Sequence, residues 1–416
     1  MSRKIKKAGI SRRGLIGAAG AGAVLAASPF RINLARAQEA AIKIGFPVPL
    51  TGPYGAEAQD QVNTAQLAVA EFNAAGGLNG RKAELLVRDD KLNPGEAATR
   101  ALELIEREKV NFICGSLSAA VQLAVNNVTK ERGVIYNSIS QSDTINEASD
   151  FSKYTFHEAL NPHLTAGAVG RYVFPKFGKK VAFLTADYAY GHEMVRGFKR
   201  AGEKFGIEPL DDIRHPIATT DFSTLLPRIQ AMKPDVLIIT NFGRDQQIAL
   251  KQATDFGLKK SIQIVAPILL FTGRLSAGAK AFEGVIGGTS YYWGVEDKIA
   301  SAKSLNANFA KTYGAGKYPS DYGAMGYSGV RSLLEASKAA GSVEADKVIP
   351  ALEALKYDYY KGPQYFRKCD HQSVQSVFMI KSKEGSSNPS DVFEVIATDE
   401  PNEANLRSCE ELGHKA

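Results

Sequence analysis

The sequence predicts an α/β protein whose mostly parallel sheets are flanked by helices and divided between two lobes. Short apolar runs alternate with amphipathic stretches of helix length, and strands joined by such helices form parallel sheets with right-handed crossovers. The alternation occurs in two successive series of similar plan. The 379 residues that follow an N-terminal export signal are also more than one hydrophobic core usually serves.

The first series predicts strands and helices in turn between residues 42 and 137. Its helices carry apolar residues at helical spacing, and the first of them closes at Gly76 and Gly77. The predicted strands are 42–50, 83–87, 111–114 and 134–137, and the predicted helices are 63–74, 94–108 and 119–131.

The second series follows the same plan between residues 162 and 266. Its predicted helices are 162–174, 191–205, 223–232 and 245–256, and its predicted strands are 180–185, 213–216, 236–240 and 262–266.

The last part of the chain is less regular. Its predicted strands are 284–290, 376–380 and 392–396, and its predicted helices are 300–313, 320–340 and 345–355. From Asp399 the chain is polar, and we expect a loosely held C-terminal tail over 400–416.

Residues 1–37 have the pattern of a twin-arginine signal peptide. A basic start leads to Arg12-Arg13, then to a weakly apolar Gly/Ala run, then to Ala35-Arg36-Ala37 as an A-x-A cleavage site. This pattern predicts export to the periplasm through the twin-arginine pathway.

The export signal accounts for the basic charge of the chain. Eight of the 51 Lys and Arg residues and none of the 44 Asp and Glu residues lie in the first 37, so the remainder has 43 basic and 44 acidic residues. A nucleic-acid partner is therefore not expected, because it would need a basic face on the folded domain. No later segment approaches the length of apolar sequence that a spanning helix needs.

Three cysteines allow one disulfide in an oxidising compartment, with three possible pairings. We favour Cys369 with Cys409, because both lie in polar sequence whereas Cys114 ends an apolar strand. Cys369-Asp370-His371 lacks a second ligand cluster, so no metal site is predicted there.

Several segments together resemble the leucine-binding-protein-like family of ABC-importer solute receptors, which have the type I periplasmic binding-protein fold. These segments are IKIGFPVPLTGPYG at 42–55, AVAEFNAAGGLNG at 68–80, GSLS at 115–118 and DYAYG at 187–191. The similarity extends from about residue 41 to about residue 396.

The resemblance implies a two-lobe clamp that closes on a small solute and delivers it to a membrane permease. It implies a first lobe of 41–157 plus 284–362 and a second lobe of 158–283 plus 363–399. We expect a monomer, with no cofactor and no metal. Open α/β sheets also place their binding loops at the carboxyl ends of their strands, which points to the same loops.

The loop at 115–120 is the expected anchor for a carboxylate. The N–H groups at a helix start and the hydroxyl of Ser118 favour an anionic oxygen; the alternative is an ordinary serine N-cap. Ser116 belongs to the same loop. The family usually has a hydroxyl where this chain has Ala119, so only the backbone N–H of Ala119 could contribute.

The loop at 138–142 matches the stretch from which relatives supply a carbonyl and a hydroxyl. It implies roles for Gln141 and Ser142, and less surely for Ser140; the alternative is a polar turn. Aromatic residues at loop positions are expected to surround the ligand body. The predicted ligand-binding set also includes Tyr54, Tyr190, Phe242, Ile268 and Tyr292. The Tyr291-Tyr292-Trp293 cluster could equally be packing at a lobe edge.

One absence bears on the ligand. Relatives that bind amino acids usually hold the ammonium with a carboxylate in the loop after the fourth strand of the second lobe, but no Asp or Glu occurs between Asp255 and Glu283. A buried ammonium without an anionic partner is costly. The sequence thus favours an apolar or aromatic acid as the ligand. The alternative is an amino acid or amide, whose amine Asp187 or Asp245 could hold in place of the missing carboxylate.

An enzyme is not expected. His192-Glu193 lacks the second histidine of a zinc-protease helix, and neither a nucleophile elbow nor a phosphate-binding Gly-Lys-Ser/Thr loop occurs. A chemosensory receptor domain and an exported cofactor enzyme are the less favoured alternatives.

Overall fold

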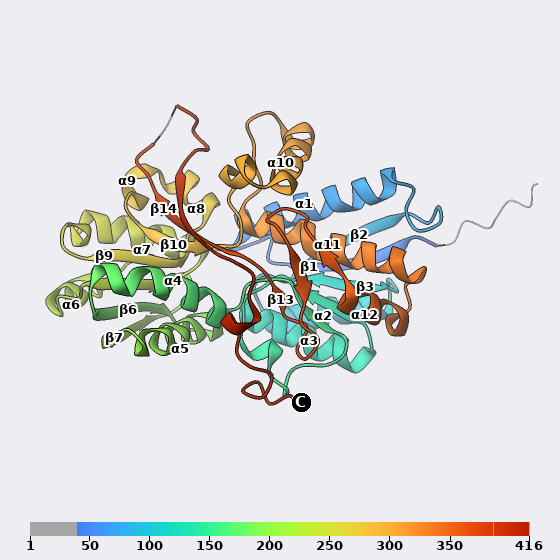
Figure 1. Cartoon of the computed structure of the whole chain (residues 1–416), viewed down its shortest axis with the longest axis horizontal. Helices are drawn as coiled ribbons and strands as arrows, with labels where there is room; N and C mark the ends of the chain where they lie inside the picture. Colours follow the sequence, from blue (N-terminus) through green and yellow to red (C-terminus); the bar gives the residue numbers. More distant parts are fainter. Residues whose placement is uncertain (1–39, 386, 416) are drawn as a thin grey trace, which may run out of the picture. The chain divides into compact units, whose positions relative to one another are not determined.

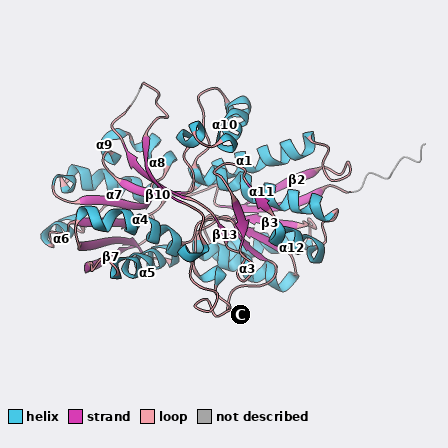
Figure 2. Ribbon diagram, viewed as in Figure 1, coloured by secondary structure: helices cyan, strands magenta, loops and turns pink. Residues whose placement is uncertain are grey.

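The computed structural model describes residues 40–385 and 387–415. The expected signal peptide at 1–37 lies outside these residues. Strands and helices alternate along most of the described chain, and the strands lie between helices (Figures 1 and 2). The predicted α/β fold class is confirmed.

The first lobe is built on a five-stranded parallel sheet with the order β2-β1-β3-β4-β5. Its strands are β1 (Ile42–Val48), β2 (Ala83–Asp89), β3 (Phe112–Gly115), β4 (Ile135–Ser138) and β5 (Thr155–His157). Its helices are α1 (Gly55–Ala74), α2 (Pro94–Glu106), α3 (Ala119–Arg132), α11 (Asp321–Ala340) and α12 (Ala345–Ala354).

Alternate residues of these strands pack against different helices, as the two-residue period of a strand requires. Phe112 and Cys114 of β3 belong to the core that α1 and α11 cover, whereas Ile113 belongs to a separate cluster with α2 and α3. α1 and α11 are distant in sequence and lie side by side (Figure 1). They approach closely at Gly326, where a Cβ atom would lie 2.5 Å from the carbonyl oxygen of Gln61.

The second lobe is built on a seven-stranded sheet with the order β15-β14-β10-β9-β8-β6-β7. Its parallel strands are β6 (Lys180–Ala186), β7 (Glu208–His215), β8 (Val236–Thr240), β9 (Gln263–Ile268) and β10 (Ile286–Thr289). Strands β14 (Val377–Ser382) and β15 (Phe393–Asp399) extend the sheet in antiparallel fashion. Its helices are α4 (Pro162–Phe177), α5 (Ala189–Glu203), α6 (Leu226–Ala231), α7 (Gly243–Asp255), α8 (Phe271–Ala277) and α9 (Ala279–Phe282).

Smaller elements complete the fold. They are α10 (Ala300–Tyr313), a sheet of β11 (Lys356–Tyr357), β12 (Gln364–Phe366) and β13 (Ser373–Val374), and the 3-10 helices η1 (Thr144–Asn146), η2 (Leu258–Lys260), η3 (Trp293–Asp297) and η4 (Glu403–Asn405).

The chain passes between the two main sheets after β5, after β10 and before β14. The division into lobes remains a proposal, and sheet membership favours boundaries other than those expected at 284 and 363. β10 pairs with β9 and β14 in the second sheet, so residues 286–289 belong with the second lobe. β12 pairs with β11 and β13, so the third crossing lies between 374 and 377.

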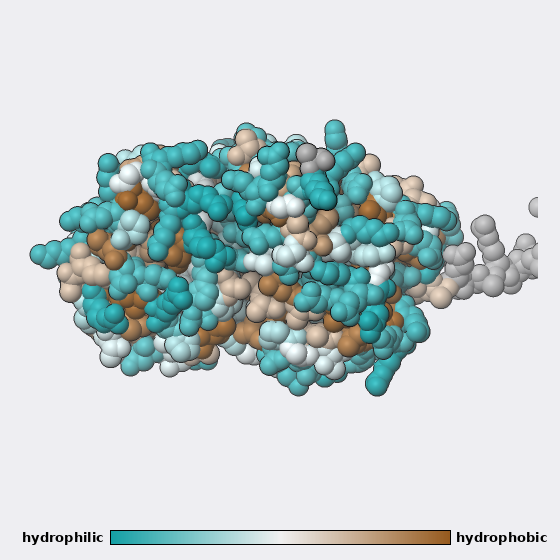
Figure 3. All heavy atoms as spheres, turned by 90° about the horizontal axis from the view of Figure 1, so that it is seen from below, coloured by the Kyte–Doolittle hydropathy of each residue, from teal (hydrophilic) through white to brown (hydrophobic). Residues whose placement is uncertain are grey.

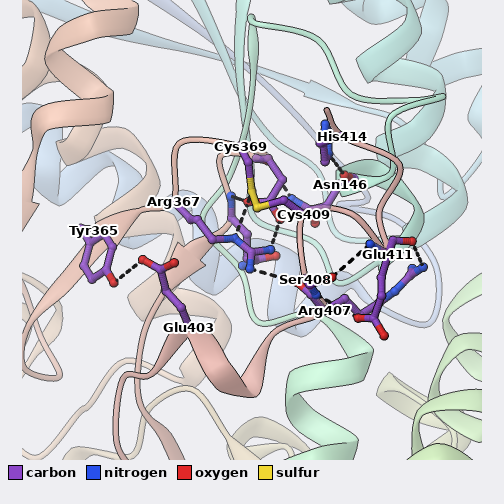
Figure 4. Close-up of a disulfide and its surroundings, with 12 residues drawn as sticks. Asn146, Tyr365, Arg367, Cys369, Glu403, Arg407, Ser408, Cys409, Glu411 and His414 are labelled. Atoms are coloured by element: carbon purple, nitrogen blue, oxygen red, sulfur yellow. Dashed lines mark hydrogen bonds and ion pairs between the residues drawn. A yellow bond between two sulfur atoms is a disulfide. The ribbon is translucent and has the colours of Figure 1, made fainter. Parts of the chain in front are cut away.

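The expectation of a loosely held tail is wrong. The predicted disulfide between Cys369 and Cys409 is present, Arg407 forms an ion pair with Glu147 at 2.6 Å, and His414 bonds to the carbonyl of Asn146 at 2.7 Å (Figure 4). Leu406 and Leu412 are buried. The prediction took the polar sequence as a sign of loose attachment, but charged and polar side chains form the contacts that hold this segment in place.

The face shown in Figure 3 is mostly hydrophilic, with hydrophobic residues in small groups. Among the described residues, no helix is long and apolar enough to cross a membrane.

Candidate functional site

The loops that follow the parallel strands of both lobes meet at the carboxyl ends of those strands. From the first lobe come the loops after β1, β3 and β4, and from the second lobe come the starts of α5 and α7. This is the edge at which open α/β sheets hold their ligands.

Aromatic rings from both lobes form a cluster at this edge. The ring of Phe242, which precedes α7, lies 4.8 Å from that of Tyr54 and 4.9 Å from that of Tyr322, both of the first lobe. The ring of Tyr190, on the first turn of α5, lies 6.4 Å from that of Phe242. We call Tyr54, Tyr190, Phe242 and Tyr322 the ring cluster; all four are at most 3 % exposed.

The backbones of the two lobes also touch beside the ring cluster. The N–H of Arg244 donates to the carbonyl of Pro53 at 3.2 Å. Gly243 has a φ of +56°, and a Cβ atom there would lie 2.6 Å from the Pro53 oxygen and 2.7 Å from Cδ1 of Tyr54. A residue without a side chain is therefore needed where the lobes meet.

Side-chain hydrogen bonds also join the two lobes. Glu193 of α5 accepts from the Ser142 hydroxyl at 3.1 Å, from the Asp143 N–H at 2.9 Å and from the Thr144 hydroxyl at 2.6 Å. Thr272 of α8 donates to Glu57 of α1 at 2.6 Å. The structure is thus a closed arrangement held by contacts between the lobes.

The start of α3 has the features of an anion site. Ser118 stands at the N-cap and is buried, but its side chain makes no capping hydrogen bond. The first N–H groups of a helix have no partner within it, and the dipole of the helix makes this end positive. Ser118 therefore does not form the capping hydrogen bond of an ordinary serine N-cap, which was the alternative interpretation of this residue.

Several buried polar atoms on or beside the loops that follow the strands have no hydrogen-bond partner within the described residues. They are the hydroxyl oxygens of Ser116, Ser140, Thr185 and Tyr190. Oδ1 of Asp321, at the start of α11, likewise has no hydrogen-bond partner there. Buried polar groups are nearly always bonded in folded proteins. These groups therefore suit a partner that does not belong to the chain.

Not all predicted residues lie together. Tyr54, Tyr190 and Phe242 meet in the ring cluster, and Ser116, Ser118 and Ala119 lie at the start of α3. Gln141 accepts from the Thr165 hydroxyl at 3.4 Å, and Ser142 bonds to Glu193, so both contact the second lobe.

Two further predicted residues have mainly structural contacts. The Ile268 side chain is buried at the end of β9, and its carbonyl accepts from Gln246 at 2.7 Å. The Tyr292 hydroxyl accepts from the N–H of Val392 at 3.1 Å, and its ring packs 5.4 Å from that of Phe393. For Tyr292, the alternative of packing at a lobe edge fits better than a place in the ring cluster.

Sequence reasoning missed a group of buried carboxyls beside the rings. Asp321 begins α11, and Glu57 and Asp60 lie on α1. Burial, with the neighbouring Glu57 and Asp60, raises the pKa of Asp321 to about 8. Burial likewise raises the pKa of Glu57 and of Asp60. Asp321 directly precedes Tyr322, whose ring lies 4.9 Å from that of Phe242 in the ring cluster. The charge of Asp321 helps to raise the pKa values of Tyr190 and Tyr322.

The two carboxylates named as possible amine partners differ from one another. Asp187 is about half exposed and pairs with His192 at 2.7 Å. Asp245 is buried and accepts from the N–H of Ala218 at 2.8 Å. Asp245 also borders a pocket of about 270 Å³ that Gly52, Pro53 and Arg244 help to line, at the rim of the lobe interface.

The described residues include no group of three or more His, Cys, Asp or Glu that could hold a metal ion.

Comparison with known proteins agrees with this geometry. A family model described as periplasmic binding protein matches residues 41–387. The Leu/Ile/Val-binding protein homolog 1 of Brucella suis biovar 1 (strain 1330) is 25% identical over 334 residues, which cover 77% of this chain and 83% of that protein.

Solved structures agree as well. A periplasmic binding protein from Burkholderia mallei aligns with a TM-score of 0.82 and 28% identity, covering 89% of this chain and 97% of that chain. An amino acid ABC transporter substrate-binding protein from Pseudomonas fluorescens Pf-5 aligns with a TM-score of 0.81 and 23% identity, covering 91% of this chain and 100% of that chain.

Proposed function

Because this chain belongs to the periplasmic binding protein family, we propose that it is the substrate-binding component of an ABC importer and captures one small solute between its two lobes. The family and the solved neighbours are solute-binding proteins. The solute would then pass to a membrane permease. The family and the twin-arginine pattern at 1–37 support a periplasmic location.

One observation carries the proposal most directly. Rings from both lobes meet at the carboxyl ends of the strands, beside buried hydroxyls that lack a partner within the described chain. Rings and unpartnered hydroxyls together suit a guest that has an apolar body and polar ends.

The solute we propose carries a carboxylate and an apolar or aromatic body. Its carboxylate would lie at the start of α3, where the N–H groups and the hydroxyl of Ser118 favour an anion. Its body would lie against the ring cluster, where aromatic side chains provide contact area with little loss of conformational entropy.

Binding would favour the closed arrangement because only that arrangement brings both lobes to the solute. A ligand shifts such an equilibrium by its difference in affinity for the two states. The contacts of Glu193 with 142–144 and of Thr272 with Glu57 would add to the stability of the closed state.

Thermal-shift measurements with a panel of aliphatic acids, aromatic acids and amino acids test the proposal. We expect at least one of these acids to raise the melting temperature of the wild-type protein. Ser118→Ala and Tyr190→Ala should reduce that rise, whereas Ser304→Ala, on the exposed face of α10, should leave it unchanged. Unchanged shifts in both site variants would place the pocket elsewhere, and turnover of a bound acid would contradict a transport role.

A further inference from the structure

Asp321 differs from the other buried carboxyls at the lobe interface in its partners. Glu57 accepts from Thr272, and an oxygen of Asp60 accepts from the N–H of Ser320 at 2.6 Å. Oδ1 of Asp321 is buried and has no hydrogen-bond partner within residues 40–385 and 387–415. A buried carboxyl oxygen without a donor is costly, so a donor from outside the chain would be stabilising.

The protein's own cation near Asp321 is already engaged. Lys361 is buried and lies within electrostatic range of both Glu158 and Asp321. Its ammonium donates to Oε1 of Gln375 and, at 3.2 Å, to the carbonyl of Ser376. Within the described residues, Oδ1 of Asp321 therefore receives no hydrogen bond from Lys361 or from any other basic side chain.

The surroundings of Asp321 suit a positive charge. Asp60 accepts from the N–H of Ser320, the residue before Asp321, and Tyr322 of the ring cluster is the residue after it. Glu57 and Asp60 also lie close enough to raise the pKa of Asp321. Aromatic faces attract cations, and carboxylates pair with them. The start of α3, by contrast, favours negative charge.

We propose that Asp321 of the first lobe binds a cationic ammonium group of the solute, so that the solute is a zwitterion whose carboxylate lies at the start of α3. This inference rests on the proposed function and narrows its solute class. It assigns the positive end of the solute to α11 rather than to the loop after β9, where no carboxylate occurs between Asp255 and Glu283.

Matched pairs of probes that differ only in the amine test the inference. L-phenylalanine is compared with 3-phenylpropionate, and L-leucine with 4-methylpentanoate, by isothermal titration calorimetry. In at least one pair, we expect the amine-bearing member to bind the wild-type protein at least about tenfold more tightly than the amine-free member. A difference of this size matches the contribution of a hydrogen bond to a charged group.

Two isosteric variants separate the candidate carboxylates. Asp321→Asn should abolish the preference for the amine while still binding the amine-free acid, which also shows that the variant is folded. Asp245→Asn should keep the preference. Loss of the preference in Asp245→Asn alone would overturn the inference and assign the cation to Asp245.

The remaining outcomes distinguish this inference from the function it rests on. Equal or tighter binding of the amine-free acids by the wild-type protein would overturn the role of Asp321 and leave the proposed function standing. Failure of all four probes to bind, together with no thermal shift from any acid of the panel, would contradict both.

Proton release provides a measurement that needs no variant. Asp321 faces Glu57 and Asp60 of α1, Tyr190 of α5, Tyr322 of α11, and Tyr360 and Lys361 between β11 and β12. Its pKa of about 8 keeps it mostly protonated at pH 7, and an ammonium beside it favours the ionised form. Calorimetry at pH 7 in buffers of different ionisation enthalpy should therefore show close to one proton released with the amine-bearing acid. Equal proton release with the amine-free acid would overturn the inference, because the proton would then come from a group that does not meet the ammonium.

Discussion

Ser118 shows how one residue can occupy a structural position without filling its usual structural role. It stands at the N-cap of α3, yet its side chain makes no capping hydrogen bond. Asn93 stands at the N-cap of α2, and its side chain accepts from the N–H of Glu96 at 3.0 Å. The two positions therefore separate the contribution of a cap to stability from a role in binding.

Ser118→Ala should lower the free energy of unfolding by less than about 0.5 kcal/mol, because no capping bond is lost, whereas Asn93→Ala should lower it by about 1 kcal/mol. Urea unfolding of the two variants measures both effects. In ligand titrations the order should reverse, with reduced affinity in Ser118→Ala only. A full capping cost at Ser118 would contradict the anion-site assignment.

Asp90, which lies outside the site, leads to a prediction about how the stability of the protein depends on pH. Its carboxyl is buried after β2, and one oxygen accepts from the N–H of Leu92 at 2.9 Å while the other has no partner within the described residues. Burial, with the nearby Asp89, raises its pKa to about 7. Since the folded pKa exceeds the unfolded value of about 4, this group makes the protein less stable as the pH rises from about 4 to 7.

Asp90→Asn keeps the acceptor for Leu92 and removes the charge. The variant should match the wild type near pH 4 and exceed its free energy of unfolding by at least about 1 kcal/mol at pH 8. Denaturant unfolding at the two pH values measures this. The exposed Asp211→Asn is the control, expected to stay within about 0.5 kcal/mol. A gain that is equal at both pH values would show that the buried charge is not its cause.

Asp321 shows why part of the candidate site could not be predicted. Ser320 and Asp321 have the local pattern of a helix start, and Ser320 does accept from the N–H of Gly323. Only the packing of α11 on α1 brings Asp321 to Glu57, Asp60 and the ring cluster, and no local pattern in the sequence encodes that contact. Tyr54 and Phe242 could be named as candidates because both are aromatic residues in loops after predicted strands, at positions that the family resemblance also indicates.

At the scale of elements, strongly periodic segments could be predicted well. The helix at Ala300–Tyr313 has the predicted bounds. α1 begins at Gly55 rather than at Asn63, because its first two turns are polar and small and are buried by tertiary contacts instead of by an apolar stripe. The short strands β5, β11, β12 and β13 were not predicted, since two or three residues have no detectable period.

The C-terminal segment shows that a disulfide can order polar sequence. Cys369 and Cys409 are 40 residues apart, and residues near Cys409 bond to the first lobe through Arg407 and His414. Cross-linking a loop of this length restricts the unfolded chain. The double variant Cys369→Ser/Cys409→Ser should lose about 2 to 4 kcal/mol of unfolding free energy.

Thermal unfolding with and without dithiothreitol tests this. The wild-type protein should shift downward under reduction to the value of the double variant, and the double variant should not respond to the reductant. An equal response of both proteins would assign the effect to something other than this disulfide.

For the whole molecule, closure depends on surfaces that come from distant parts of the chain. Pro53 and Tyr54 of the first lobe meet Gly243 and Arg244 of the second, and Glu57 meets Thr272. The mostly parallel sheets and the binding loops at their carboxyl edge could be predicted from the sequence, because strands that alternate with helices form parallel sheets. The strand order could not, because it depends on long-range pairing. The contacts between the lobes could not, because each depends on how two separately folded sheets close on one another.

Gly243→Ala tests whether this closure is needed for binding. The new methyl group would lie 2.6 Å from the carbonyl oxygen of Pro53 in the opposite lobe, so it should oppose closure while each lobe still folds. Gly341→Ala is the matched control: Gly341 also has a positive φ, of +62°, but a Cβ atom there would meet nothing within 4 Å. Both variants carry the left-handed backbone cost of about 1 to 2 kcal/mol, and only Gly243→Ala adds the clash.

We expect Gly243→Ala to bind the solute at least about tenfold more weakly than Gly341→Ala and to show no compaction in small-angle X-ray scattering when the solute is added, because binding energy must then work against the clash. Equal affinity and equal compaction in the two variants would mean that the solute binds without the lobes meeting at Gly243.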